Sequence, residues 1–539
     1  MKKKDFTFRK TDKVESLVEL TERSAKIYGD DIAVKYKKRK GLFEKTYNDV
    51  KQDSEKIAQY LMRCGLERGH IALLGSSSYE WMCSYIGTMY ASLTVIPLDR
   101  ALEIPTLYEQ IIDAECDMIL YDSGYKTAAE SLIEKSGGRL RGFCMDDDFP
   151  VCEEKLPYPQ TDPDKLSAIL FTSGTTGKSK GVMLTQRNIA HDVISAVSAV
   201  NINRENGDVA MSVLPFNHAF ECTCSIFCTL YLGVPVCLSR GLKYMQKEFA
   251  EYQPTVMFIV PMIAEKLYDR IWLAAKKQGK EDILKKGLKL SRLANRFGID
   301  ISDKLLGDVK AAFGGSLKFL ICGGAPLREK IIEKYEELGI ILFQGYGLTE
   351  CSPILTLNSD SYHRPGSVGK VIEPCTVKSV DGEIWAKGTT ISTGYYNNSE
   401  ATAESFVDGW FRTGDMGYVD KDGYVFLTGR KKNLIILGNG ENVSAEELEG
   451  YISGLEYVTE VVTYGEDGKI VAEIYIDPEL NEVPSAEQID KDIEALNRGL
   501  AHYKRIEKFI LRDDPFEKTT TQKIKRYNTN KERSAHAEG

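Results

Sequence analysis

At 539 residues the chain exceeds the length that one hydrophobic core usually supports, which indicates two or more domains. Its hydrophobic content of 42%, charged content of 28% and net charge of −9 are typical of a globular protein and argue against general nucleic-acid binding, which needs a broad basic face. Residues 502–539 contain ten Lys and Arg and six Asp and Glu. This basic excess fits either a local function such as binding phosphates or a solvent-exposed tail with no function.

Neither a membrane anchor nor a disulfide framework is visible. The lysines of the first ten residues precede no apolar signal segment, and the longest apolar run, 222–238, is too short and too interrupted to span a bilayer. The twelve cysteines form no paired framework, and Cys222, Cys224 and Cys228 match no common zinc spacing. We therefore expect a cytoplasmic protein with buried structural cysteines and no transmembrane segment, for which transient membrane contact stays open.

The first 430 residues alternate short apolar strands with amphipathic helices. Residues 71–75 predict a strand, a capping box of Ser77 and Glu80 predicts the start of a helix, and residues 95–98 predict the next strand. Such a crossover implies parallel pairing. The same rhythm predicts further strands at residues 118–121, 168–171, 256–260 and 319–322. The sequence thus predicts an α/β fold with stacked, mostly parallel sheets and covering helices.

After residue 376 the pattern changes to short strands with Asp-Gly turns at Asp381, Asp422 and Asp467. The first two turns predict a small β-rich subdomain within a large N-terminal domain, residues 1–430. Residues 431–539 contain a hairpin pattern, a helix pattern at 486–500 and the basic tail, which predict a small α+β C-terminal domain.

A loop dense in glycines and hydroxyl groups, TSGTTGKSKG, directly follows the strand predicted at 168–171. Its glycines allow close approach of the backbone, its hydroxyls can donate to phosphate oxygens, and its lysines supply positive charge. The P-loop of nucleotide triphosphatases is excluded by register, because Thr172 stands where its first glycine belongs. The residues predicted to bind phosphate are Thr172, Ser173, Gly174, Thr175, Thr176, Gly177 and Lys180.

This loop resembles the phosphate-binding signature of the adenylate-forming superfamily, which contains acyl-CoA synthetases, peptide-synthetase adenylation domains and luciferases. Further motifs of that family follow in order from about residue 15 to residue 527. Within the family, VPMIAEKLYDRI at residues 260–271 is similar to a segment of bacterial long-chain fatty acyl-CoA synthetases, and the short stretch 351–371 lacks the insertion of fatty acyl-AMP ligases. The resemblance implies an ATP- and Mg²⁺-dependent ligase that forms acyl-AMP and pyrophosphate and then passes the acyl group to CoA.

The resemblance assigns an acyl pocket to two loops. LPFNHAFE places His218 and Phe220 in the pocket wall. CGGAP places Gly323, Gly324 and Ala325 against the adenine, with Gly324 and Ala325 also in the pocket floor.

The motif QGYGLTE, residues 344–350, is the most specific match. The ring of Tyr346 suits stacking on the adenine, the Thr349 hydroxyl a contact to the α-phosphate, and the Glu350 carboxylate a bond to Mg²⁺. Gln344, Gly345 and Gly347 complete the nucleotide-binding residues of this loop.

In the C-terminal part the resemblance assigns Asp415 to the ribose hydroxyls and Arg430 to the ribose or a phosphate. Lys432 falls at the family's hinge position, which implies a mobile C-terminal domain. LGNGENV resembles the loop that faces the pantetheine tunnel, with Gly440 and Glu441 at the thiol.

The segment TTTQKIK resembles the family's catalytic-lysine segment and makes Lys523 the catalytic candidate, together with Thr349 and Glu350. The more common family form is Ser-Gly-Lys, whereas Thr-Gln precedes Lys523 in this chain, so Lys525 is the alternative.

Two other functions stay open. One is an adenylating enzyme that loads an acyl or amino acid onto a phosphopantetheinyl carrier protein such as an acyl carrier protein. The other is a nucleotide-binding homologue without catalysis, against which the intact Glu350, Asp415, Arg430 and Lys523 argue.

Overall fold

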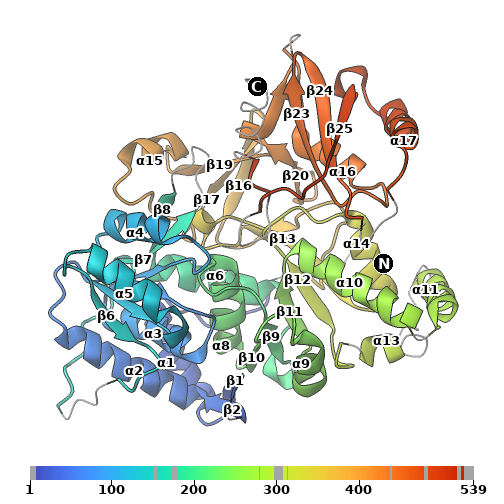
Figure 1. Cartoon of the computed structure of the whole chain (residues 1–539). Helices are drawn as coiled ribbons and strands as arrows, with labels where there is room; N and C mark the ends of the chain where they lie inside the picture. Colours follow the sequence, from blue (N-terminus) through green and yellow to red (C-terminus); the bar gives the residue numbers. More distant parts are fainter. Residues whose placement is uncertain are drawn as a thin grey trace. The chain divides into compact units, whose positions relative to one another are not determined.

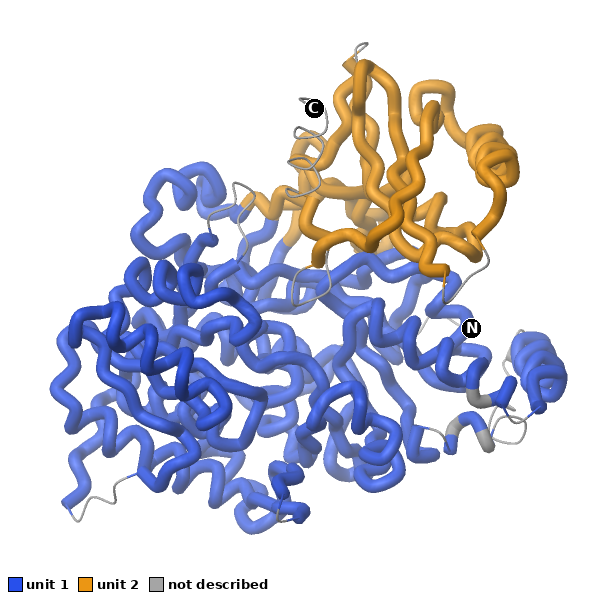
Figure 2. The backbone as a smooth tube through the Cα atoms, in the orientation of Figure 1, with its two compact units in different colours: residues 1–376, 386–411 blue, residues 377–385, 412–539 orange. Residues whose placement is uncertain are grey.

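A computed structural model describes residues 8–526 apart from 40, 150–153, 173–178, 278, 296–306, 312, 438–439, 479–482 and 519–523, and apart from the side chains of 274, 308 and 310. The chain forms two compact units, residues 1–376 with 386–411 and residues 377–385 with 412–539 (Figure 2). The chain crosses between the units three times, within strands β16 (Thr376–Val380), β17 (Glu383–Lys387) and β19 (Trp410–Val419). The domain boundary expected after residue 430 stays a prediction.

A six-stranded sheet of the first unit has the order β6-β5-β3-β4-β7-β8 (Figure 1). Its strands are β3 (His70–Leu74), β4 (Thr94–Pro97), β5 (Met118–Tyr121), β6 (Arg141–Cys144), β7 (Leu166–Thr172) and β8 (Lys180–Thr185). Strand β3 pairs in parallel with β4 and β5, and only β8 is antiparallel to its neighbour. The strand–helix–strand crossover predicted at residues 71–98 is therefore confirmed.

The capping residue predicted for helix α3 (Tyr79–Tyr90) is wrong by one position. Ser78, not Ser77, is the N-cap, and its Oγ accepts a hydrogen bond from the Trp81 backbone N at 3.1 Å. The Ser77 Oγ instead accepts from the Phe216 backbone N at 3.0 Å and donates to the Leu214 carbonyl at 3.3 Å. Ser77 thus stabilises the segment that leads to His218, a distant contact that local sequence cannot reveal.

A nine-stranded sheet of the same unit has the order β15-β14-β13-β12-β11-β9-β10-β1-β2. The strands from β1 to β13 in this order are parallel, and the outer strands β2, β14 and β15 are antiparallel to their neighbours. The bounds are β1 (Ile32–Lys38), β2 (Gly41–Thr46), β9 (Ala210–Ser212), β10 (Val236–Leu238), β11 (Val256–Ile259), β12 (Phe319–Cys322), β13 (Ile341–Tyr346), β14 (Thr356–Leu357) and β15 (Lys370–Val371).

Helices accompany both sheets, as the α/β pattern predicts. Besides α3 they are α1 (Leu17–Tyr28), α2 (Tyr47–Arg63), α4 (Ile104–Asp113), α5 (Lys126–Lys135), α6 (Gln186–Ala199), α7 (Ala219–Glu221), α8 (Thr229–Leu232), α9 (Met245–Tyr252), α10 (Pro261–Lys277), α11 (Glu281–Asn295), α13 (Gly307–Ala311), α14 (Glu329–Glu337) and α15 (Ser399–Ser405). Short 3₁₀ helices lie at Ser123–Tyr125, Arg204–Asn206 and Thr349–Cys351.

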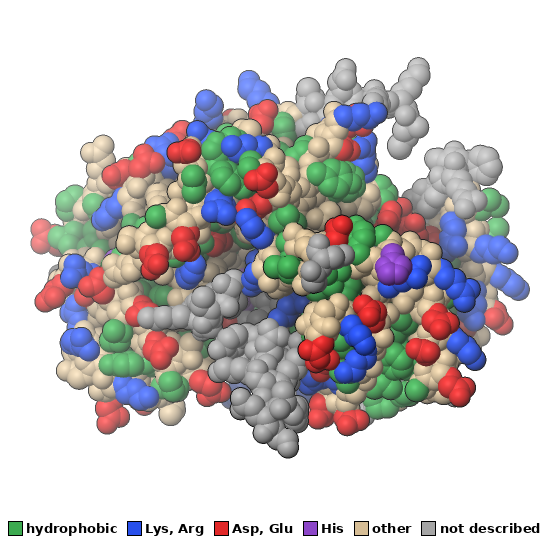
Figure 3. All heavy atoms as spheres, turned by 90° about the horizontal axis from the view of Figure 1, so that it is seen from above, with side chains coloured by type: hydrophobic (Ala, Val, Ile, Leu, Met, Phe, Trp, Pro, Cys, Tyr) green, Lys and Arg blue, Asp and Glu red, His purple; other side chains and the backbone are tan. Residues whose placement is uncertain are grey.

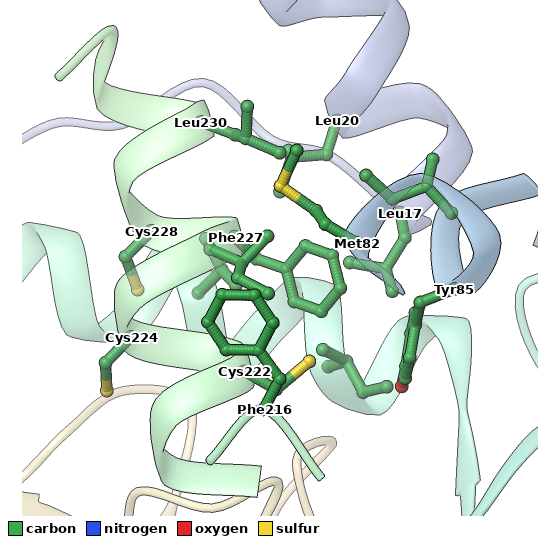
Figure 4. Packing of buried hydrophobic residues seen from close by; sticks show 14 of the residues in the cluster. Leu17, Leu20, Met82, Tyr85, Phe216, Cys222, Cys224, Phe227, Cys228 and Leu230 are labelled. Carbon is green, nitrogen blue, oxygen red and sulfur yellow. The ribbon is translucent and has the colours of Figure 1, made fainter. Parts of the chain in front are cut away.

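The apolar run 222–238 forms a buried π-helix, Cys222–Cys228, followed by α8 and β10. Figure 4 shows Phe227 on the side of the π-helix that faces Met82 and Tyr85, while Cys224 and Cys228 point to the other side. No helix in the described ranges is both long and apolar enough to cross a membrane. On the face drawn in Figure 3, Lys and Arg are interspersed with Asp and Glu rather than gathered in one stripe.

The β-rich part predicted after residue 376 is a five-stranded sheet with the order β16-β17-β19-β18 and β20 beside β19. Its other strands are β16 (Thr376–Val380), β17 (Glu383–Lys387), β18 (Phe406–Val407) and β20 (Val425–Arg430). Asp381 and Gly382 both have positive φ, which suits a two-residue hairpin turn. The turn at Asp422 is longer than this two-residue turn. It is held by the Asp420 carboxylate, which accepts hydrogen bonds from the backbone N of Asp422 and of Tyr424.

The α+β character predicted for residues 431–539 is confirmed. The elements are the 3₁₀ helix Lys431–Asn433, β21 (Leu434–Ile436), β22 (Asn442–Ser444), α16 (Ala445–Ile452), β23 (Glu460–Glu466), β24 (Lys469–Tyr475), α17 (Ala486–Arg498), the 3₁₀ helix His502–Lys504 and β25 (Lys508–Arg512). Strands β23, β24 and β25 form a sheet in that order, and its core with α16 and α17 contains Leu448, Ile474 and Ile489.

Candidate functional site

Three of the loops predicted to bind acid and nucleotide, those after β9, β12 and β13, leave one edge of the nine-stranded sheet. Strands β9, β11, β12 and β13 are parallel neighbours, and their carboxyl ends meet at the same edge. The register pairs Ile259 with Cys322 and Cys322 with Gln344, so the chain leaves the sheet at matched positions. Because open α/β sheets bind ligands at the carboxyl ends of their strands, this edge is the candidate site of the first unit.

The predicted acyl-pocket residues lie together at this edge. The Phe220 ring packs directly on Gly323, where a Cβ would come within 3.1 Å of Phe220 Cζ. The same ring lies edge-on to Phe258 of β11, with 6.4 Å between the ring centroids. Gly324 and Ala325 follow Gly323 with the backbone of Gly324 exposed and at a φ of +82°. His218 is the N-cap of α7, the helix that carries Phe220.

Glu221 holds the start of this segment through hydrogen bonds that the sequence did not predict. Its side chain is fully buried, and its Oε1 accepts hydrogen bonds from the Ser212 hydroxyl and from the backbone N of Val213 and Leu214. Burial raises the pKa of the Glu221 carboxyl to about 7, although these hydrogen bonds favour the charged form. The only sequence signal is an acidic residue beside an apolar run.

Replacing Glu221 with Gln should change how stability depends on pH. The folded pKa of about 7 lies above the ordinary value of 4.5, so folding takes up a proton between these values. The stability that this group contributes is present below the ordinary value and is lost as pH rises through the folded pKa. Glu221→Gln removes this loss, so its free energy of unfolding relative to wild type should rise by about 2–3 kcal/mol from about pH 5 to about pH 8.

Urea unfolding at a series of pH values measures this difference. Glu205→Gln, on an exposed 3₁₀ turn, is the matched control and should follow the wild-type curve. A difference between Glu221→Gln and wild type that stays constant over the pH range would contradict the assigned titration.

The QGYGLTE motif ends strand β13 and turns into the 3₁₀ helix Thr349–Cys351. Gly347 is required at this turn, because a Cβ would lie 1.8 Å from the Pro353 carbonyl oxygen. The Tyr346 carbonyl accepts from the Leu355 backbone N at 2.9 Å, and the Gln344 carbonyl accepts from the Asn358 backbone N at 3.0 Å. These bonds fix the backbone from which Tyr346 and Thr349 extend.

Glu350 fits the role of a Mg²⁺ ligand. Its side chain is buried, its Oε1 accepts a hydrogen bond from the Tyr395 hydroxyl at 2.8 Å, and no described basic side chain forms an ion pair with it. In the described parts of the chain, no three or more His, Cys, Asp or Glu residues form a cluster suited to a metal. Mg²⁺ is usually held by one or two carboxylates together with substrate phosphates, so one buried carboxylate is a suitable protein ligand.

The predicted phosphate loop joins two antiparallel strands. Thr172 ends β7, Lys180 begins β8, the two residues are partners in the sheet, and the Thr172 hydroxyl donates to the Lys180 carbonyl at 3.4 Å. A Walker P-loop joins a strand to a helix, whereas this loop joins two antiparallel strands. The topology therefore excludes the Walker class independently of the register. Outside the described residues lie Ser173, Gly174, Thr175, Thr176 and Gly177.

In the second unit the two predicted ribose-binding residues lie face to face. Asp415 and Arg430 are partners on β19 and β20, and Arg430 Nε is 2.6 Å from Asp415 Oδ1. The Asp415 side chain is 5% exposed and that of Arg430 is 40% exposed, so the carboxylate is fixed while the guanidinium reaches solvent. The pair offers both a fixed hydrogen-bond acceptor and a positive charge.

The predicted hinge residue, Lys432, is exposed in the 3₁₀ helix Lys431–Asn433. Partial desolvation of its ammonium group by the surrounding protein lowers the pKa of Lys432, and the charges of Arg430 and Arg526 lower it further. Glu446 of α16 accepts hydrogen bonds from the Asn433 side chain and, at 3.3 Å, from the Arg430 backbone N. The hinge segment is therefore bound to α16, a contact absent from the sequence prediction.

The predicted thiol loop lies in the β21–β22 hairpin. Gly440 has a φ of +83°, its backbone N donates to the Leu437 carbonyl at 2.9 Å, and the Glu441 carbonyl accepts from the Leu437 backbone N at 3.0 Å. A Cβ on Gly440 would meet no atom of the described residues within 4 Å, so this position is open.

The predicted catalytic residue, Lys523, lies outside the described residues. Its alternative, Lys525, forms an ion pair with Glu517 and donates from its backbone N to the Glu517 carbonyl at 2.8 Å. Arg526 forms an ion pair with Glu449, whose carboxyl pKa burial raises to about 7. The choice between Lys523 and Lys525 as the catalytic lysine stays a prediction.

Two family models of known proteins together match most of the chain. The family model described as AMP-binding enzyme matches residues 21–396, and the model of the AMP-binding enzyme C-terminal domain matches residues 432–536. The chain is 30% identical to a long-chain-fatty-acid–CoA ligase of Mycobacterium bovis over 522 residues, 86% of this chain and 87% of the relative. It is 28% identical to a 2-succinylbenzoate–CoA ligase of Listeria monocytogenes over 427 residues, 78% of this chain and 81% of the relative.

The fold is shared with the solved structure of o-succinylbenzoate CoA synthetase from Bacillus subtilis in complex with its acyl-adenylate intermediate. The TM-score is 0.77 at 22% identity, over 95% of this chain and 97% of that chain. At this identity the likeness shows the fold alone.

Proposed function

The chain belongs to the family of AMP-binding enzymes, and from that membership we infer that this AMP-forming acid–CoA ligase acts on a long-chain fatty acid. Its co-substrates are ATP, with Mg²⁺, and CoA. The observation that supports the fatty acid is the apolar wall of the candidate pocket, where Phe220 lies over Gly323 and edge-on to Phe258. The similarity to a long-chain-fatty-acid–CoA ligase over 86% of the chain points the same way.

In the first half-reaction, a carboxylate oxygen of the acid attacks the α-phosphorus of ATP, and pyrophosphate leaves. No protein nucleophile is needed, so the residues contribute position and charge stabilisation. In this proposal Thr172 and Lys180 of the β7–β8 hairpin bind phosphate oxygens, and Thr349 binds the α-phosphate. Glu350 would hold Mg²⁺, which when bound supplies positive charge to the phosphate oxygens.

In the second half-reaction, the CoA thiol attacks the acyl carbonyl carbon of acyl-AMP, and AMP leaves with the electrons of the broken C–O bond. We assign the pantetheine arm to Gly440 and Glu441 of the β21–β22 hairpin, where a Cβ on Gly440 would meet no described atom within 4 Å. We propose that residues 431–539 act as a small mobile domain hinged at Lys432, so that Lys523 serves the first half-reaction and the Gly440 hairpin the second.

A panel of acids tests the choice of substrate. Thioester formation with CoA is measured for saturated fatty acids from medium to long chain, for 2-succinylbenzoate and for benzoate. We expect the highest kcat/KM with a long-chain fatty acid, and a highest value with 2-succinylbenzoate would contradict the proposal. A phosphopantetheinyl carrier protein replaces CoA in a parallel series, and a preference for the carrier would favour the carrier-loading function instead.

Phe220→Ala tests the assigned wall directly. Removing the ring opens space above Gly323. Acids long enough to fill this space should therefore gain in kcat/KM relative to shorter acids. Because one methylene in an apolar pocket is worth about 1–3 kcal/mol, the ratio of kcat/KM for long over medium chains should rise about tenfold or more. Phe43→Ala, which removes a half-buried ring at the other end of the sheet, should leave the ratio unchanged. An unchanged ratio in Phe220→Ala would place the acyl chain elsewhere.

A further inference from the structure

One segment, residues 390–396, joins the phosphate-binding hairpin to the turn that carries Glu350. On one side the Met183 backbone N donates to the Gly394 carbonyl at 2.9 Å, and the Tyr396 backbone N donates to the Gly181 carbonyl at 2.8 Å. On the other side the Ser392 backbone N donates to the Glu350 carbonyl at 2.7 Å. The segment therefore holds two parts of the candidate site that lie far apart in the sequence.

Tyr395 is the residue of this segment that reaches both parts with its side chain. Its backbone forms an antiparallel bridge with Val182 of β8. Its hydroxyl donates to Glu350 Oε1 at 2.8 Å, and Lys180 Nζ lies 5.0 Å from the centre of its ring. The side chain is 7% exposed and packs against Phe406, so its position is fixed.

The contact with Glu350 constrains the orientation of a carboxylate that has no other described side-chain donor. A hydrogen bond to Oε1 restricts the rotation of the carboxylate, while Oε2 accepts no hydrogen bond from any described residue. An oxygen held in this way needs no rotation before it binds a cation, and fixed first ligands are the usual means of tuning a metal site.

The contact of the Tyr395 ring with Lys180 likewise restricts the position of a positive charge. An ammonium group attracted to the face of a buried ring keeps one position instead of sampling the many rotamers of a free lysine. Lys180 begins the strand that leaves the phosphate loop, so its charge is held at the base of that loop.

We propose that Tyr395 is a positioning residue for the ATP-dependent step, which orients the Glu350 carboxylate toward Mg²⁺ and holds the Lys180 ammonium beside the phosphates. The proposal rests on the proposed function, since it requires that Glu350 binds Mg²⁺ with ATP.

Tyr395→Phe separates the two contacts, because phenylalanine keeps the ring under Lys180 and removes only the hydroxyl. We expect the Mg²⁺ concentration for half-maximal rate to rise about tenfold, as for loss of a hydrogen bond to a charged group. The affinity for Mn²⁺, measured by electron paramagnetic resonance in complex with a non-hydrolysable ATP analogue, should fall by a similar factor. Saturating Mg²⁺ should restore kcat, which it would not do if the substitution had damaged the fold.

The chain offers a matched control in the adjacent residue. The Tyr396 hydroxyl donates to the Glu115 carboxylate at 2.6 Å, the same type of hydrogen bond at a different place. Tyr396→Phe should leave the affinity for Mn²⁺ unchanged, and an equal fall in both variants would overturn the proposal.

Glu350→Gln distinguishes failure of this proposal from failure of the proposed function. If Glu350→Gln weakens Mn²⁺ binding and Tyr395→Phe does not, Glu350 is the metal ligand and Tyr395 does not position it. If Glu350→Gln leaves Mn²⁺ binding unchanged, the assignment of Mg²⁺ to Glu350 is wrong and the role of Tyr395 falls with it.

Discussion

Lys523→Ala should abolish the formation of acyl-AMP and spare the formation of thioester from supplied acyl-AMP. The reason is that a lysine ammonium stabilises charge on the phosphate oxygens only while the α-phosphorus is attacked. Removal of one such group costs about 10²–10³-fold in rate, so acid-dependent pyrophosphate exchange should fall by this factor. The reaction of synthetic acyl-AMP with CoA should stay within about twofold of wild type.

Lys525→Ala is the matched control, since Lys525 lies two residues further along and forms an ion pair with Glu517. An ion pair of two partly exposed side chains contributes little, so both half-reactions should stay near wild type. Equal losses of the two half-reactions in Lys523→Ala would show that the proposed division of labour is wrong. A loss confined to Lys525→Ala would make Lys525 the catalytic lysine.

The second large effect is expected from Asp415→Asn. The buried Asp415 carboxylate is held by Arg430 at 2.6 Å and is assigned to the ribose hydroxyls. Asparagine keeps the shape but removes the charge that strengthens these hydrogen bonds, each worth about 1.5–3 kcal/mol. The KM for ATP in pyrophosphate exchange should rise about 10–100-fold, while the KM for the acid changes little.

Glu383→Gln controls for the loss of a buried charge in the same sheet. Glu383 is also 5% exposed and is paired with Lys431 at 2.9 Å and with Arg412 at 3.6 Å. Thermal unfolding should show that both variants lose stability, whereas only Asp415→Asn should raise the KM for ATP. A similar rise in both would mean that Asp415 acts through the fold and not through the nucleotide.

The elements that sequence predicts best depend on local patterns. Strand β12 has the predicted bounds because a four-residue apolar run lies between Lys318 and Gly323, and the turn at Asp381 follows from a dipeptide that favours positive φ. The cap of α3 was missed by one residue because Ser77 and Ser78 are adjacent candidates. Only the distant Leu214 and Phe216 decide between them, by bonding Ser77.

The same distinction holds in the candidate site. Parallel strand order predicts that the loops with Gly323 and Tyr346 meet, and the structure brings them together. Tyr395 lies 45 positions from Glu350 and carries no signal of its own, so their hydrogen bond appears only when the chain is folded. Glu221 and Arg526 escaped prediction for the same reason, since each acts through partners on other elements.

Acid-dependent exchange of pyrophosphate into ATP measures acid activation by itself, because it requires ATP, acid and a reversible acyl-AMP but no thiol. The protein is incubated with ATP, Mg²⁺, labelled pyrophosphate and one acid at a time. We predict exchange that depends on added long-chain fatty acid and is lost in Lys523→Ala. Absence of exchange with every acid of the panel would show that the protein does not form acyl-AMP from these acids, and would favour a nucleotide-binding homologue without catalysis.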